Sequence, residues 1–120
     1  MIKGIGVDLV TVDRFSSLSD HQLKRMFAPS EVERANLLEG KGREEFLASR
    51  FAAKEAFAKA FGTGIRGFSL PDVEVLSDDV GKPYLGFSSK LEQMTKGFKF
   101  HLSISHEKGM AIAMVVCDEI

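Results

Sequence analysis

The sequence predicts an α+β fold, in which an antiparallel sheet packs against one long helix with short flanking helices. Three features predict it: a β-rich run at residues 2–10, a helical segment at residues 43–61 that lacks glycine and proline, and a mostly β-rich second half. The 120 residues contain no internal repeat and no linker-like tract. We therefore expect one domain over residues 1–120.

The first strand, at residues 2–10, carries an unexpected polar residue. Strand alternation places three large apolar side chains on one face and two glycines with an aspartate on the other, namely Ile5, Val7 and Leu9 against Gly4, Gly6 and Asp8. Aspartate is depleted in strands, and glycines there often mark the close approach of a second backbone or a ligand. Asp8 is therefore a candidate ligand for a hard cation such as Mg²⁺. The alternative is that the strand ends at Val7 and that Asp8 begins a turn or caps a helix.

The middle of the chain is predicted to be helical. Residues 19–27 and the segment from Pro29 onward are expected to form short helices. The glycines of residues 40–42 are expected to break the chain before the long helix at residues 43–61, which is rich in Ala, Glu, Lys and Phe. Gly62 then ends this helix as a glycine C-cap would.

Glu55 is the second candidate in this part of the chain. At 100° per residue it falls beside Ala48, Ala52 and Lys59, away from the apolar arc that contains Phe57. Small side chains around a carboxylate allow a neighbouring element or a ligand to come close. The alternative is an ordinary i,i+4 pair of Glu55 with Lys59 on a solvated face, which contributes about 0.2–0.5 kcal/mol.

The second half is predicted to return to β-structure. Four runs are β-rich, at residues 73–76, 84–87, 98–105 and 110–117. Residues 88–95 are expected to form a short helix, and residues 106–109 a hairpin turn between the last two strands. His106, beside this turn, is a candidate phosphate ligand or general base, or simply a solvated histidine.

Composition excludes several classes of protein and leaves others open. Sixteen Lys+Arg against seventeen Asp+Glu, a net charge of -1, argue against a dedicated nucleic-acid binder. The single Cys117 excludes an intrachain disulfide framework and a multi-cysteine zinc site. We expect no membrane span, because no apolar run approaches the ~20 residues that a span needs. The composition, 44% hydrophobic and 28% charged, is that of an ordinary globular domain and predicts a cytoplasmic location. Arg14, Lys24 and Arg25 occur among apolar residues, a mixture that suits an acidic partner surface or an ordinary amphipathic helix.

Four motifs, taken together, resemble the holo-[acyl-carrier-protein] synthase family, the small bacterial 4′-phosphopantetheinyl transferases. They are G-I-G-V-D-L-V at residues 4–10 followed by Arg14, R-F-A-A-K-E-A-F-A-K-A-F-G-T-G-I at residues 50–65, G-K-P at residues 81–83 and H-L-S-I-S-H-E at residues 101–107. The motifs occur in the order and spacing of the family, and the resemblance covers essentially the whole chain. It implies transfer of 4′-phosphopantetheine from coenzyme A to a serine of apo-acyl carrier protein, which releases 3′,5′-ADP and supports fatty acid biosynthesis.

The resemblance also implies roles for particular residues. Asp8 and Glu55 become the protein ligands of a Mg²⁺ that also holds the coenzyme A pyrophosphate, and Lys59 contacts that pyrophosphate. Glu55 is our first candidate for the base, directly or through a metal-bound water, and His106, near the nucleotide, is the second. Further segments that line the coenzyme A site contain Gly62, Gly64, Lys82 and Pro83.

The resemblance extends to partners. Arg14 matches the arginine that docks the carrier protein, with Lys24 and Arg25 in the docking helix. Family members form homotrimers with active sites shared between neighbours, so Asp8 and Arg14 are expected to act with Glu55 and Lys59 of another chain. Two other readings stay open: a Mg²⁺-dependent phosphoesterase that uses water as the nucleophile, and a non-catalytic module that binds coenzyme A or an acidic protein.

Overall fold

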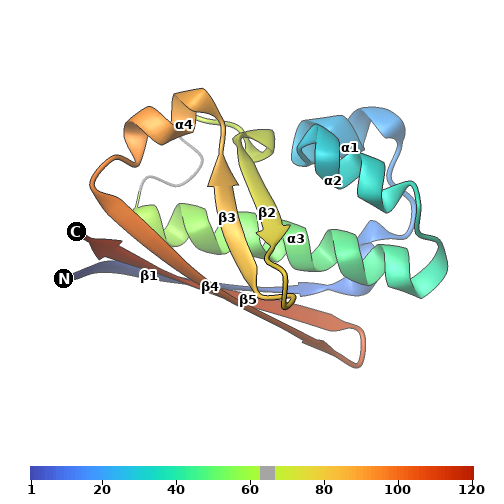
Figure 1. Cartoon of the computed structure of the whole chain (residues 1–120). Coiled ribbons are helices and arrows are strands. Elements are labelled where there is room, and N and C mark those ends of the chain that lie inside the picture. The colour runs from blue at the N-terminus through green and yellow to red at the C-terminus, as the bar shows by residue number, and fades with distance from the viewer. Residues whose placement is uncertain (63–66) are drawn as a thin grey trace.

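The computed structural model describes residues 1–62 and 67–120, and it confirms the α+β prediction. Strands β1 (Ile2–Thr11), β5 (Met110–Glu119) and β4 (Phe98–Glu107) form an antiparallel sheet in the order β1-β5-β4. The long helix α3 (Gly40–Phe61) lies along one face of this sheet (Figure 1). A second sheet, of β2 (Val73–Ser77) and β3 (Pro83–Phe87), packs against α3 through β2 and against β4 through β3.

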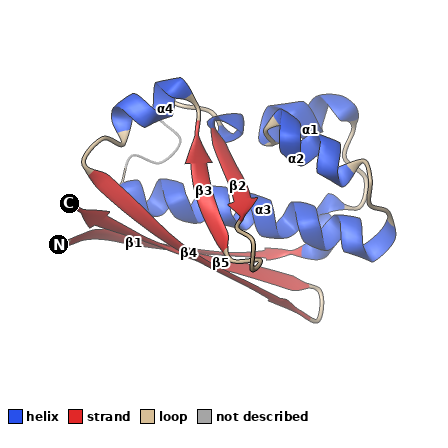
Figure 2. Cartoon of the chain, in the orientation of Figure 1, coloured by secondary structure: helices blue, strands red, loops and turns tan. Residues whose placement is uncertain are grey.

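Most of the shorter helices lie on the side of α3 away from the sheet of β1, β5 and β4 (Figure 2). The shorter helices are α1 (Asp20–Met26), α2 (Pro29–Ala35), α4 (Ser89–Met94) and two 3-10 helices at Val12–Phe15 and Leu70–Asp72. A capping box begins α1: the Gln22 amide donates to Ser19 Oγ, and the Ser19 amide donates to the Gln22 side chain. No helix of the described ranges is long and apolar enough to cross a membrane.

Two boundaries differ from the sequence prediction. The expected break at residues 40–42 is wrong, because α3 already begins at Gly40, whose φ of 63° is accessible to glycine. The hairpin turn is also shorter than expected, since Lys108 and Gly109 alone connect β4 to β5, with φ of 50° and 78°. His106 therefore lies inside β4, paired with Ala111, rather than in the turn.

The hydrophobic core lies on both sides of α3. Phe57 is fully buried, and its ring centroid lies 5.0–5.6 Å from those of four other phenylalanines, Phe61, Phe68, Phe87 and Phe100. Most of these pairs are edge-to-face or tilted, the arrangement that aromatic quadrupoles favour. The cluster joins α3 to β3 and β4.

The glycines of β1 explain how closely α3 approaches the sheet. A Cβ atom on Gly4 would overlap the carbonyl oxygen of Ala60, and one on Gly6 would overlap that of Ala56. The space beside these glycines is therefore filled by the helix backbone. Asp8 is on the same face of β1 as these glycines, so it lies directly against α3.

The opposite face of the sheet carries exposed apolar side chains. Ile5, Val7 and Leu9 of β1 are 61%, 48% and 58% exposed. They pair across β5 with Val116, Met114 and Ile112, of which the last two are also exposed. We call Ile5, Val7, Leu9, Ile112 and Met114 the apolar sheet face. A contiguous exposed patch of this kind marks an interaction surface.

Candidate active site

Asp8 and Lys59 meet where β1 crosses the last turns of α3. Lys59 Nζ lies 3.2 Å from Asp8 Oδ1 and donates a hydrogen bond of 2.9 Å to the Val7 carbonyl. The Asp8 side chain is only 16% exposed, whereas that of Lys59 is 55% exposed. Lys59 therefore holds a largely buried carboxylate while its ammonium group stays open to a ligand.

Glu55 lies one helical turn before Lys59 and is half-buried. Burial raises the pKa of Glu55 above its usual range and the nearby Asp8 charge raises it further, while Lys59 and Arg14 act in the opposite direction. Two carboxylates that repel each other at one edge of a helix form a site that favours a bound cation.

The other oxygen of Asp8 supports the same conclusion. Within the described part of the chain, Asp8 Oδ2 is buried and has no hydrogen-bond partner. A buried unsatisfied carboxylate oxygen is costly, and a divalent cation would satisfy it. Across residues 1–62 and 67–120 no group of three or more His, Cys, Asp or Glu side chains gathers at one place. Such a sparse set, Asp8 with Glu55, fits Mg²⁺, which usually takes one or two carboxylates together with substrate phosphates and water.

Arg14 lies close to this pair of carboxylates. It follows β1 in the 3-10 helix, and its guanidinium carbon is 5.2 Å from the ring centroid of Phe51, a residue of α3. The expectation that Asp8 and Arg14 act with Glu55 and Lys59 of a different chain is therefore wrong. The close approach of α3 to β1 brings all four together within one chain.

The end of α3 agrees with the prediction of a C-cap. Gly62 takes a φ of 84°, and its amide donates to the Ala58 carbonyl at 3.1 Å. Gly62 follows Lys59 by three residues, so it lies at the same end of the helix. Gly64, also predicted to line the coenzyme A site, lies outside the described residues.

His106 and Pro83 belong to a second place on the surface. Both line a cavity of about 420 Å³ beside the first half of α3, together with Leu38, Gly42, Glu45, Phe46, Ser49, Arg50, Ser77, Gly81 and Ile104. His106 Nδ1 lies 3.6 Å from Glu45 Oε2. Lys82 is exposed and is not among the lining residues; its amide donates to Asp78 Oδ1 within the turn.

These two groups of predicted site residues are far apart in one chain. Glu45, which contacts His106, and Lys59, which contacts Asp8, are separated by fourteen residues of α3. At a rise of 1.5 Å per residue this corresponds to ~21 Å along the helix axis. The group of Asp8, Glu55 and Lys59 is thus distinct from the cavity that holds His106.

The basic residues assigned to partner docking lie on the surface. Lys24 and Arg25 are exposed in the last turn of α1, where they also complement the helix dipole. Arg14 is exposed as well. The structure thus leaves all three accessible.

Sequence reasoning missed a buried ion pair between α2 and α3. Lys54 Nζ lies 2.5 Å from Glu31 Oε1, and both side chains are almost fully buried. The Lys54 ammonium also donates to the carbonyls of Leu70 and Val73. Burial lowers the pKa of Lys54, while the Glu31 charge raises it. No local pattern pairs these residues, because Glu31 belongs to α2 and Lys54 to α3.

Comparisons with known proteins identify a family over nearly the whole chain. The model of the 4′-phosphopantetheinyl transferase superfamily matches residues 4–117. A holo-[acyl-carrier-protein] synthase of Halothermothrix orenii is 46% identical over 127 residues and aligned over 99% of each chain. One of Bacillus subtilis is 44% identical, over 100% of this chain and 98% of the relative.

Solved structures show the same fold. A holo-(acyl-carrier-protein) synthase from Bacillus anthracis, in complex with CoA (3′,5′-ADP), superposes with a TM-score of 0.87 at 42% identity, over 100% of this chain and 99% of that one. The enzyme from Neisseria meningitidis superposes with a TM-score of 0.90 at 35% identity, over 99% and 100%. Because the match covers the chain from end to end, the protein belongs to the 4′-phosphopantetheinyl transferase superfamily and, within it, to the holo-[acyl-carrier-protein] synthase family.

Proposed function

We propose that this protein transfers 4′-phosphopantetheine from coenzyme A to a serine hydroxyl of an apo-acyl carrier protein and releases 3′,5′-ADP. The observation that carries the proposal is the pair of Asp8, with its unsatisfied buried oxygen, and Glu55, whose pKa is raised beside it. The names of the relatives, and the CoA complex of the Bacillus anthracis structure, support the choice of substrates.

Asp8 and Glu55 would hold a Mg²⁺ ion. When bound, the ion would neutralise the negative charge of the pyrophosphate and make its phosphorus more electrophilic. Lys59 adds a positive charge at the same place, since its side chain is 55% exposed and lies one helical turn from Glu55.

The proton of the serine needs an acceptor. In the transfer, the serine oxygen forms a bond to the phosphorus next to the pantetheine arm, and the bond from that phosphorus to 3′,5′-ADP breaks. We assign the proton to Glu55, because its raised pKa makes it a better base than an ordinary surface carboxylate. His106 is the second candidate: within one chain it lies beside Glu45 and away from Glu55, so it would act on the serine only from a neighbouring subunit.

Arg14, Lys24 and Arg25 are proposed to dock the carrier protein. All three are exposed, and Lys24 and Arg25 lie next to each other in the last turn of α1. Acyl carrier proteins are acidic, so these cations would steer the encounter, and the effect should weaken as salt increases.

We also propose that the chain forms a homotrimer with shared active sites. Two observations support this: the exposed apolar sheet face needs a covering partner, and the His106 cavity is separated from Asp8 within one chain. In such an assembly the His106 cavity of one subunit would complete the Asp8–Glu55 group of its neighbour. Co-expression of D8A with H106A tests the sharing, because mixed trimers contain some interfaces with both intact groups. Activity no higher than that of the two single variants would contradict it.

We propose that residues 1–120 act as one domain, that the enzyme works in the cytoplasm, and that its product serves fatty acid biosynthesis. These three assignments rest on the family membership and on the supply of coenzyme A and apo-carrier that the reaction requires.

One experiment separates this function from its alternatives. The protein is incubated with coenzyme A, Mg²⁺ and an apo-carrier protein, and the intact mass of the carrier is measured. A mass increase of one phosphopantetheine group, absent with D8A or excess chelator, supports the transferase. Hydrolysed coenzyme A beside an unmodified carrier would identify a phosphoesterase, and no reaction with tight coenzyme A binding would identify a binding module.

A further inference from the structure

The buried ion pair of Glu31 and Lys54 lies where α2, α3 and β2 meet. The Lys54 side chain is 0% exposed and that of Glu31 is 2% exposed. Neither side chain can contact coenzyme A or a carrier protein, and neither belongs to the group of Asp8, Glu55 and Lys59. Any effect of this pair on the transfer must therefore pass through other residues.

The Lys54 ammonium group joins α3 to four other segments. It lies 2.5 Å from Glu31 Oε1 of α2 and donates to the carbonyls of Leu70 and Val73 at 3.1 and 2.5 Å. An ammonium group has three hydrogen-bond donors, so all of them are used. The group also lies 5.5 Å from the ring centroid of Phe27, the residue that ends α1. Lys54 is therefore fixed by contacts to α1, α2, the second 3-10 helix and the start of β2.

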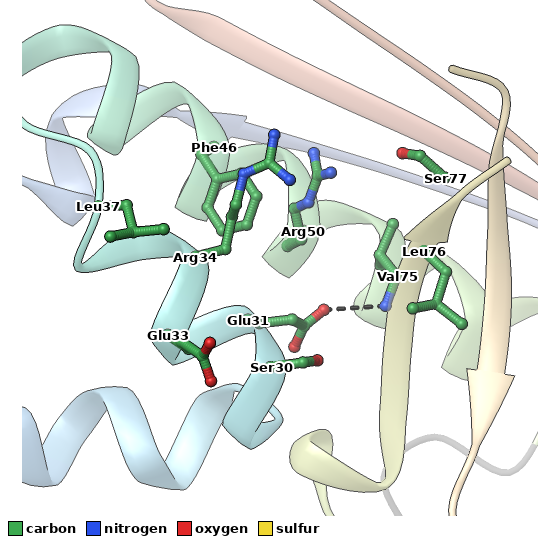
Figure 3. A pocket seen from close by; sticks show the side chains of 10 residues that line it. All are labelled: Ser30, Glu31, Glu33, Arg34, Leu37, Phe46, Arg50, Val75, Leu76 and Ser77. Carbon is green, nitrogen blue, oxygen red and sulfur yellow. Dashed lines mark hydrogen bonds between the residues drawn. The ribbon is translucent and has the colours of Figure 1, made fainter. Parts of the chain in front are cut away.

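Glu31 extends the same network to the start of α2 and to β2. Its Oε1 also accepts from the Ala28 amide, and its Oε2 accepts from the Val75 amide, both at 2.9 Å. Figure 3 shows the carboxylate turned toward β2 and its bond to the Val75 amide. Ala28 is the N-cap of α2 and directly follows Phe27, the C-cap of α1. The pair thus holds the connection between the two short helices as well.

Close packing does not fix α2 by itself. A cavity of about 370 Å³ lies between α2, α3 and β2, beside Glu31 (Figure 3), and one of about 500 Å³ lies between α1, α2 and Pro71. Interlocking side chains orient elements that pack without gaps, whereas a helix beside open space needs another constraint. A buried ion pair adds little stability over apolar residues of similar volume, but its directional bonds favour one arrangement.

We propose that Glu31 and Lys54 are positioning residues for the transfer, because they fix α1 and α2 in one orientation relative to Glu55. Lys54 directly precedes Glu55 in α3, so the helix carries this constraint to the proposed base and metal ligand. Lys24 and Arg25, proposed to dock the carrier, are on α1. The pair thus sets where a docked carrier presents its serine, a role that rests on the proposed function.

The orientation is tested first, without any substrate. The double variant E31Q/K54M removes both charges and keeps side chains of similar size. Residual dipolar couplings of the backbone amides report how α1 and α2 lie relative to α3. We expect the three helices of the wild type to fit one alignment tensor, and α1 and α2 of E31Q/K54M to need a different one. A single tensor for all three helices of the variant, with the wild-type orientation, would overturn the proposal.

The kinetic consequence is tested with the carrier assay, at a temperature at which each variant is fully folded. We expect E31Q/K54M to lower kcat about tenfold or more, because a displacement of ~1 Å at the reacting groups is enough for such a loss. KM for coenzyme A and the rise in Tm caused by Mg²⁺ should not change, since Asp8 and Glu55 remain. KM for the carrier should also stay close to that of the wild type, because the docking cations stay exposed. A wild-type kcat would overturn the proposal.

Leu91→Ala is the matched control for lost stability. Leu91 is fully buried in α4, which lies on the far side of β2 and β3 from α1 and α2 (Figure 1). The cavity left by L91A should lower the Tm, while kcat and the single tensor should be kept. An equal loss of kcat in L91A would assign the effect to stability and overturn the proposal. If the wild type transfers nothing to the carrier, the proposed function fails, yet the dipolar couplings still decide the orientation, so the two failures are distinguishable.

Discussion

Lys59 Nζ lies 3.2 Å from Asp8 Oδ1 and joins the last turns of α3 to the middle of β1, across 51 residues of sequence. Gly4 and Gly6 make this contact possible, because they let the carbonyls of α3 lie directly on the strand. The proposed metal ligand and the proposed phosphate ligand thus depend on one helix–strand contact.

Changing Gly6 to alanine tests that dependence. The new Cβ would overlap the Ala56 carbonyl, which is backbone and must shift as a whole. We expect G6A to lose about 1–3 kcal/mol of unfolding free energy, as overpacked sites do, and to lose activity because Asp8 moves relative to Glu55. The measurements are urea unfolding and the carrier assay.

Gly42 provides the matched control for this change. It lies in the first turn of α3, where a Cβ atom would meet nothing within 4 Å, so G42A should leave the free energy of unfolding unchanged or slightly higher. Because Gly42 lines the His106 cavity, it serves as a control for stability alone. Equal free energies of unfolding for G6A and G42A would show that the fold does not need the close contact between β1 and α3.

Glu55→Gln should raise stability and abolish activity. Burial and the Asp8 charge both disfavour the ionised carboxylate, so removing its charge should raise the free energy of unfolding in the absence of metal. Transfer should be abolished, because the variant loses a metal ligand and the proposed base. Thermal unfolding with and without Mg²⁺ is the measurement.

The metal supplies a second readout for the same variant. Mg²⁺ should raise the Tm of the wild type, since it binds only the folded state, and should have little effect on E55Q. A metal-free Tm of E55Q below that of the wild type would contradict the repulsion between Asp8 and Glu55.

Local pattern explains which parts of this site could be predicted from sequence. Asp8 stood out as an acid in an apolar strand, and Glu55 and Lys59 as neighbours on a glycine-free helix within a family motif. The Lys54–Glu31 pair could not be predicted, because its partners belong to different helices and meet only after packing.

Local pattern also fails to predict where α3 begins and which face of β1 is exposed. The glycines at residues 40–42 resemble a break, yet a positive φ at Gly40 lets the helix begin there. Alternation in β1 correctly separated Val7 from Asp8, but it could not show that the apolar side would be the exposed one. That outcome depends on where α3 packs.

Lys54→Met tests the buried ion pair. The change would leave the Glu31 carboxylate, 2% exposed, without its cation, and breaking one side of such a pair costs about 3–5 kcal/mol. We expect a loss of this size in urea unfolding, and partial recovery in the double variant E31Q/K54M, which removes the unpaired charge.

The control for this change is on the same helix. Lys41 pairs with Asp13 at 3.8 Å, with side chains 64% and 88% exposed, so K41M should cost less than ~1 kcal/mol. If K54M were no more destabilising than K41M, the buried pair would not stabilise the fold.

Arg14 and Arg25 should differ in kinetic effect although both are assigned to carrier docking. R25Q should raise KM for the carrier and leave kcat unchanged, because Arg25 is exposed on α1. R14Q should also lower kcat, most strongly at low pH, because Arg14 lowers the pKa of Glu55 and its removal leaves more of that base protonated. Steady-state kinetics at low and high salt measure both, and equal kcat values for the two variants would exclude a role of Arg14 beyond docking.

Val7→Lys should prevent assembly through the apolar sheet face. Val7 is 48% exposed in the single chain and pairs with Met114, so a charge there would be buried in any assembly that covers this face. In the single chain the lysine would meet water, and the fold should survive. We expect light scattering to show monomers. Transfer activity should be lost, because no neighbour supplies its His106 cavity.

Val80→Lys is the matched control, since Val80 is 88% exposed in the β2–β3 turn. This variant should leave the mass of the assembly and its activity unchanged. An active V7K monomer would show that one chain contains a complete site, and a V7K trimer would place the interface on another surface.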